Sequence, residues 1–148
     1  MGRTIAIATL VAGTLDILFA MILTVIYGRE IPNMLRYVGS GPFPAATDMG
    51  TAGAAIGLLT HFVLMAIMAA AFVYAARQWP PLLQKPIQWG IVYGLITYVV
   101  MNWIVVPLRF DTPLPPKPLS IATQLFAHIV LVGLPIALIT ARSMRVAK

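Results

Sequence analysis

Four long apolar stretches dominate the chain, and no other feature limits its fold as strongly. They cover residues 4–27, 51–76, 87–106 and 120–141. At about 1.5 Å of rise per residue, each is long enough to cross the ~30 Å hydrocarbon core of a bilayer as a helix. Because lipid offers the backbone no hydrogen-bond partners, a spanning segment must pair its own N–H and C=O groups. The pattern predicts an all-α, polytopic membrane protein: one domain, residues 1–148, with four transmembrane helices in an antiparallel bundle.

The overall composition agrees with a bilayer environment and excludes several kinds of chemistry. Of the 148 residues, 60% are hydrophobic and only 9% are charged, which is far from the composition of a soluble domain. There is no cysteine, so disulfides, zinc–thiolate sites, iron–sulfur clusters and thiol nucleophiles are excluded. The sequence contains no G-x-S-x-G, H-E-x-x-H or phosphate-loop pattern, which argues against the enzyme classes that these motifs mark.

Lysine and arginine are distributed unequally between the two expected sides of the membrane. One side has six cations and no acid: Arg3, Arg77, Lys85, Arg142, Arg145 and Lys148. On the other side, four cations are offset by three acids: Arg29, Arg36, Arg109 and Lys117, with Glu30, Asp48 and Asp111. The positive-inside rule therefore predicts that both termini are cytoplasmic. Membrane topology also accounts for the net charge of +6, so nucleic acid is not predicted as a partner.

The connections between the stretches differ in length and character. The first is long, and its residues 31–38 have the pattern of a short amphipathic helix that would lie on the membrane surface. The second, residues 77–86, is short, which predicts that the second and third helices are antiparallel neighbours.

Small residues indicate where helices pack closely in lipid. Two G-x-x-x-G patterns occur, one with Gly53 and Gly57 and one with Gly90 and Gly94. We expect both faces to contact another helix, in the same chain or in a second copy. In the fourth stretch, Pro135 lacks a backbone N–H and crowds the carbonyl of Leu131, which predicts a loosened helix about one turn beyond His128.

Ionisable residues inside the apolar stretches are the best candidates for a functional site, because they are costly to keep in lipid. Counted from the outer ends of their stretches, Asp16, His61 and His128 all lie about 12 to 17 Å deep at ~1.5 Å per residue. Tyr98 lies at the same level of the third stretch, and Gln124 shares a helix face with His128. The sequence thus predicts a polar layer near the middle of the membrane.

Three interpretations of this layer remain open. In the first, the layer is a structural hydrogen-bond network. In the second, His61 and His128 are the axial ligands of a b-type haem, for which Gly57 and Gly94 make room. In the third interpretation, Asp16 joins the two histidines in a non-haem metal site or a proton relay.

Several short segments resemble a group of small, uncharacterised four-helix proteins of the bacterial inner membrane. The segments are residues 12–16, residues 57–62, Ala127-His128 and Gly133-Leu134-Pro135, and the resemblance spans nearly the whole chain. It implies a multi-pass location in the bacterial cytoplasmic membrane and a four-helix architecture. It implies no activity, so no functional residue is carried over.

Two classes of function follow from these observations. In the first, the protein is an accessory or structural subunit, which packs its small-residue faces against other membrane subunits or against itself. In the second, it is a membrane redox protein that binds haem b or another metal through His61 and His128. The histidine pair discriminates between them, because a structural pair tolerates an amide replacement and a haem ligand does not.

Overall fold

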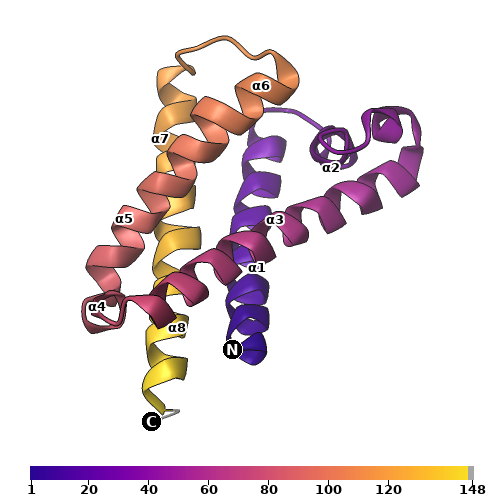
Figure 1. Cartoon of the computed structure of the whole chain (residues 1–148). Coiled ribbons are helices and arrows are strands. Elements are labelled where there is room, and N and C mark those ends of the chain that lie inside the picture. The colour runs from indigo at the N-terminus through magenta and orange to yellow at the C-terminus, as the bar shows by residue number, and fades with distance from the viewer. Residues whose placement is uncertain (147–148) are drawn as a thin grey trace.

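The structure is a computed structural model that describes residues 1–146, and within them every regular element is helical. Lys148, which the charge count includes, lies outside the described residues. The start of α1 and the end of α8 lie at the same end of the molecule as the short helix α4 (Figure 1). We call this end the N/C end, and we call the opposite end, where α2 and α6 lie, the loop end.

Four helical spans in the described part of the chain are long and apolar enough to cross a membrane. The first is α1 (Gly2–Ile26) and the second is α3 (Gly50–Gln78). The third consists of α5 (Pro86–Val99), a π-helical segment η2 (Val100–Val105) and α6 (Val106–Phe110). The fourth consists of α7 (Pro118–Phe126), a second π-helical segment η3 (Ala127–Gly133) and α8 (Leu134–Val146). The predicted all-α, four-helix membrane fold is therefore confirmed.

Each π-helical segment contains the carbonyl group that a following proline crowds. Pro135 follows η3, and Pro107 follows η2. A proline removes one backbone donor and its ring presses on the carbonyl four residues earlier, and widening the turn relieves both effects. The predicted loosening near Pro135 is confirmed. The π-helical segment η2 before Pro107 has the same physical cause and was not predicted.

The spans do not pack in the order that the short connection suggests. Helix α1 packs against α3, η3 and α8, and α5 packs against η3 and α8. Helices α3 and α5 meet near α4 (Pro81–Gln84), where Tyr93 donates a hydrogen bond of 2.7 Å to the Met68 carbonyl, and then diverge (Figure 1). The prediction that these two helices are packed neighbours is thus wrong beyond their shared end, because the fourth span occupies the side of α5 that would face α3.

The core between α1, α3 and α8 is rich in alanine, which lets helix backbones approach closely. Its buried hydrophobic members are Ala8, Ala12, Met65, Ala69, Phe72, Ala76, Leu82, Val132, Ile136 and Ala137. This core lies toward the N/C end, below the level of the predicted polar layer.

The connection after α1 folds back onto the outer part of α3. It contains α2 (Ile31–Gly39), as predicted, and a 3₁₀ turn η1 (Pro44–Asp48). A Cβ atom on Gly57 would lie 1.8 Å from the Leu35 carbonyl oxygen, and one on Gly53 would lie 1.9 Å from that of Ala46. The first G-x-x-x-G pattern therefore brings α3 against the backbone of its own preceding connection, and α2 is a packed element rather than a helix held only by the membrane surface.

At the loop end, Arg109 on α6 joins the end of the third span to the connection between α1 and α3. Its Nε donates to the Gly41 carbonyl at 2.5 Å and its Nη2 to the Ser40 carbonyl at 2.6 Å. The rings of Tyr37 and Phe110 stack beside it with centroids 4.3 Å apart. These carbonyls follow the C-terminus of α2, where the helix dipole favours a cation.

We expect Arg109→Lys to lower the stability of this junction by about 1 kcal/mol, because lysine lacks the planar fork that reaches two carbonyls at once. The variant should be cleaved faster by protease in the segment 40–43. Arg29→Lys, which also replaces an arginine by a lysine at the loop end, is the control and should be cleaved like the wild type. Equal cleavage of both variants and the wild type would show that Arg109 does not hold the connections together.

Candidate functional site

His61 lies where α3 packs against α1, and only 10% of its side chain is exposed. Its Nε2 lies 2.9 Å from the carbonyl oxygen of Gly13 on α1. A carbonyl can only accept a hydrogen bond, so Nε2 carries the proton and donates it. Gly13 permits this approach, because a Cβ there would lie 2.7 Å from the ring of Phe62.

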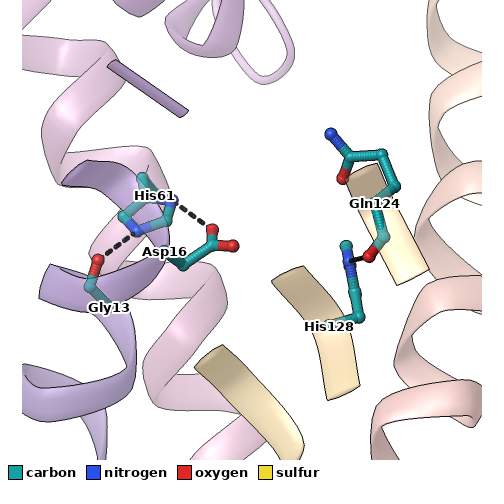
Figure 2. Close-up of polar contacts among 5 residues, drawn as sticks. All are labelled: Gly13, Asp16, His61, Gln124 and His128. Carbon is teal, nitrogen blue, oxygen red and sulfur yellow. Dashed lines mark hydrogen bonds and ion pairs between the residues drawn. The ribbon is translucent and has the colours of Figure 1, made fainter. Parts of the chain in front are cut away.

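The second nitrogen of His61 faces the carboxyl group of Asp16, one turn further along α1. The distance from Nδ1 to Asp16 Oδ2 is 3.9 Å (Figure 2). Because Nε2 already holds one proton, Nδ1 of a neutral imidazole presents a lone pair, which an ionised carboxylate would repel. The pair is favourable when one further proton lies on either Oδ2 or Nδ1. The geometry therefore places a carboxyl group and an imidazole side by side within the membrane-spanning part of the structure.

His128 faces the same carboxyl group from the fourth span. Figure 2 shows Asp16 between the two imidazoles. The Nδ1 of His128 donates to the Gln124 carbonyl on its own helix at 2.9 Å, so its Nε2 carries the lone pair. Within residues 1–146 no hydrogen bond is formed by this Nε2. The two imidazoles thus donate to main-chain carbonyls through different nitrogens, Nε2 in His61 and Nδ1 in His128.

Tyr98 and Gln124 take part in the predicted layer in different ways. The Tyr98 ring meets the His128 ring edge to face, with centroids 6.0 Å apart, and its hydroxyl accepts a 3.2 Å hydrogen bond from Trp103 Nε1. The Gln124 side chain points away from His128, and only its main-chain carbonyl is used (Figure 2). The structure therefore brings Asp16, His61 and His128 together, places Tyr98 beside them through its ring, and leaves the Gln124 amide outside.

The second G-x-x-x-G pattern positions His128. A Cβ atom on Gly94 would lie 2.5 Å from the His128 carbonyl oxygen, and one on Gly90 would lie 3.0 Å from the Leu134 Cα. On the facing span, a Cβ on Gly133 would lie 2.2 Å from the Gly90 carbonyl oxygen. The backbones of α5 and η3 are therefore in direct contact, and any side chain at these positions would displace the helix that carries His128.

These observations do not fit a b-type haem between the two histidines. The Nε2 of His61 is engaged with Gly13 and its Nδ1 faces the Asp16 carboxyl group, so neither nitrogen of this ring is directed at an open space. Gly57 and Gly94 do not leave room for a porphyrin, since the backbone of Leu35 fills the space at the first and that of His128 the space at the second. Among the described residues no group of three or more His, Asp or Glu side chains has an arrangement that could hold a metal ion.

We expect the purified protein to show no Soret band and no reduced-minus-oxidised difference spectrum after expression with added haem precursor. His61 would have to release Gly13 and Asp16 to ligate iron, which costs a buried hydrogen bond and the contact with the carboxyl group. A difference spectrum that disappears in both His61→Ala and His128→Ala would contradict this expectation.

The spans and the buried ionisable layer together define a multi-pass α-helical membrane protein with a mid-membrane carboxyl–imidazole site. Comparisons of the chain with protein-family models, curated proteins and solved structures found no match. Its function is therefore argued from its own residues.

Proposed function

We propose that this chain is an accessory, structural membrane subunit, and that the Asp16–His61 pair locks α1 against α3. The observation that carries the proposal is that one imidazole uses both ring nitrogens on the facing helix: Nε2 on the Gly13 carbonyl at 2.9 Å and Nδ1 toward the Asp16 carboxyl at 3.9 Å. Two contacts one turn apart on α1 specify both the rotation and the height of His61. A lock of this kind sets the register between helices that otherwise meet through alanine and glycine.

The membrane interior strengthens the case for a structural lock. With no water to compete, an unpaired carboxyl or imidazole group there is costly, so a slipped register is penalised. Interhelical hydrogen bonds in membranes average only ~0.6 kcal/mol, so the pair does not supply most of the stability. Its contribution is specificity, since alanine-rich faces can slide past each other at little cost.

The exposed surface of the third span supports the role of a subunit. Only 17% of its most apolar window is buried inside the protein, against 28% to 33% for the other spans. On α5, Ile91, Leu95 and Val99 form one exposed face, 39% to 47% accessible. We propose that another membrane subunit, or a second copy of this chain, covers this face.

Lipid-preserving extraction with a styrene–maleic acid copolymer and mass measurement test this role. We expect a defined assembly larger than the 16.0 kDa protomer. Leu95→Trp on the α5 face should dissociate it, whereas Leu59→Trp on the exposed face of α3 should not. A wild-type protomer that is solitary under these conditions, or equal dissociation by both variants, would reject the proposal.

A second candidate function, transfer of a proton within the membrane, is favoured by the position of His128. Its Nε2 forms no hydrogen bond within residues 1–146, and in Figure 2 the Asp16 carboxyl group lies between this histidine and His61, as in a short relay. In liposomes with an internal pH dye and an imposed potassium diffusion potential, a relay predicts proton entry that Asp16→Asn and His128→Phe abolish. Entry no faster than in protein-free liposomes would exclude it.

We propose further that the protein lies in the bacterial cytoplasmic membrane with the N/C end in the cytoplasm. The resemblance to small inner-membrane proteins supports the location. The orientation is supported by Arg3, Arg77, Lys85 and Arg142, which lie near the N/C end, whereas Glu30, Asp48 and Asp111 lie near the loop end.

Single-cysteine variants test this orientation directly, because the sequence contains no cysteine. We expect a membrane-impermeant maleimide to label Thr112→Cys in intact spheroplasts, and to label Gln84→Cys only after the membrane is opened. The reverse pattern would show that the N/C end faces outward.

A further inference from the structure

A cavity of about 750 Å³ opens at the N/C end between the first turns of α1 and the last turns of α8. Arg3 and Arg142 line it from opposite helices. Thr4 and Ser143 also line it, and their hydroxyl oxygens are 2.7 Å apart in a hydrogen bond that joins the two helices. On the membrane side the lining becomes apolar, with Ile7 and Ile139.

The charged side chains that line this cavity are both cationic. The sequence has four acidic residues, and none of them belongs to this end: Asp16 is mid-span, and Glu30, Asp48 and Asp111 are near the loop end. The Arg77 guanidinium lies next to the cavity, with Nη1 3.1 Å from the sulfur of Met1 in the cavity wall. Among residues 1–146, therefore, no acidic side chain lies at this end to neutralise Arg3 and Arg142, which line the cavity.

We propose that this cavity binds the phosphate group of an anionic membrane lipid. Two guanidinium groups and a pair of hydroxyl groups match the oxygens of a phosphate ester, because arginine donates in a planar fork and hydroxyls complete the coordination. The wall of Ile7 and Ile139 continues from this charged mouth into the bilayer, where an acyl chain lies. Basic pockets between helix ends at a membrane surface bind lipid headgroups by the same chemistry.

The apolar wall distinguishes a lipid from free phosphate as the source of this group. Inorganic phosphate would satisfy the arginines and leave Ile7, 40% exposed, in contact with water or with an unrelated lipid tail. A lipid would satisfy both parts of the cavity at once. Its acyl chain, packed along α1 and α8, would hold its phosphate at a high effective concentration near the arginines.

Native mass spectrometry and thermal melting in detergent with added lipid test the proposal. The probes are phosphatidylglycerol, the zwitterionic phosphatidylcholine, and inorganic phosphate alone. We expect phosphatidylglycerol to remain bound and to raise the melting temperature, with at least tenfold weaker apparent affinity for phosphatidylcholine. Inorganic phosphate at millimolar concentration should neither compete nor stabilise.

The double variant Arg3→Gln/Arg142→Gln identifies the residues responsible. It should lose the preference for phosphatidylglycerol at least tenfold, whereas Arg29→Gln/Lys117→Gln removes the same charge at the loop end and should keep it. Equal binding of both lipids by the wild type, an equal loss in the control variant, or stabilisation by inorganic phosphate alone would each overturn the proposal. The wild-type comparison needs no variant, so it decides the question even if the arginine variant fails to fold.

Discussion

Replacing Gly57 with alanine is expected to destabilise the protein by about 3 kcal/mol, the upper part of the usual range for overpacking a dense contact. The added Cβ would lie 1.8 Å from the Leu35 carbonyl oxygen and 3.1 Å from the Gly39 nitrogen. These neighbours are backbone atoms, so no side chain can rotate to make room. Either α2 moves away from α3 or α3 shifts, and a shift of α3 carries His61 with it.

Thermal melting in detergent and limited proteolysis of the connection between α1 and α3 measure this effect. We expect a lower melting temperature and faster cleavage between α2 and η1. Gly2→Ala is the matched control, because a Cβ there meets no atom within 4 Å, and it should melt like the wild type. If Gly57→Ala also melts and is cleaved like the wild type, α2 is not packed on α3 as the structure shows.

Removal of the His61 imidazole is expected to have an effect of similar size for a different reason. His61→Ala leaves a cavity and strips the Asp16 carboxyl group of its partner, and together these should cost about 3 kcal/mol. The Gly13 carbonyl contributes little to this loss, because as part of the regular α1 helix it is positioned to accept an intrahelical hydrogen bond as well. Most of the penalty should therefore come from Asp16 and from the cavity.

A double-mutant cycle separates these contributions. Asp16→Asn should be nearly neutral, because asparagine keeps the shape of the side chain and its amide hydrogens can face the lone pair on Nδ1 of His61. Adding Asp16→Asn to His61→Ala should recover about 1 kcal/mol, because an unpaired amide is less costly in lipid than an unpaired carboxyl group. The measurement is equilibrium unfolding in mixed micelles.

Gln124→Ala is the control for a polar side chain at the same depth, and it should change stability by less than about 0.5 kcal/mol. Only the main-chain carbonyl of Gln124 contacts His128, and alanine retains it. Strictly additive effects of His61→Ala and Asp16→Asn would show that the two side chains do not interact, and would remove the basis for the proposed lock.

The spans could be located from the sequence because the information for them is local. A chain in lipid must pair its backbone within each segment, so apolar length alone gave residues 51–76 for a helix that the structure extends over Gly50–Gln78. The short helix in residues 31–38 and the loosened turn near Pro135 are local in the same sense. The neighbours of α5 were not predictable in this way, because a short connection ties two helix ends together and leaves their far ends free to diverge.

The sequence predicts the depth of the candidate site in the membrane, but it does not predict how the helices are rotated about their axes. A constant rise per residue places Asp16, His61 and His128 at one level from their sequence positions. The rotation of each helix about its axis decides which nitrogen of His61 faces Gly13. It also decides that the Gln124 amide points away from His128. Gly13, a small residue three positions before Asp16, was the available signal, but the sequence could not reveal that its carbonyl would be the acceptor.

The sequence alone determined that this is a four-span helical membrane protein with three ionisable groups at one depth, because hydrophobic length and helical rise are properties of single segments. Only the tertiary structure decided that Asp16 faces His61, that backbone atoms fill the space beside Gly57 and Gly94, and that two arginines line one cavity. Those outcomes depend on contacts between residues far apart in the chain, where the close approach of one helix is made possible by the glycines and alanines of another.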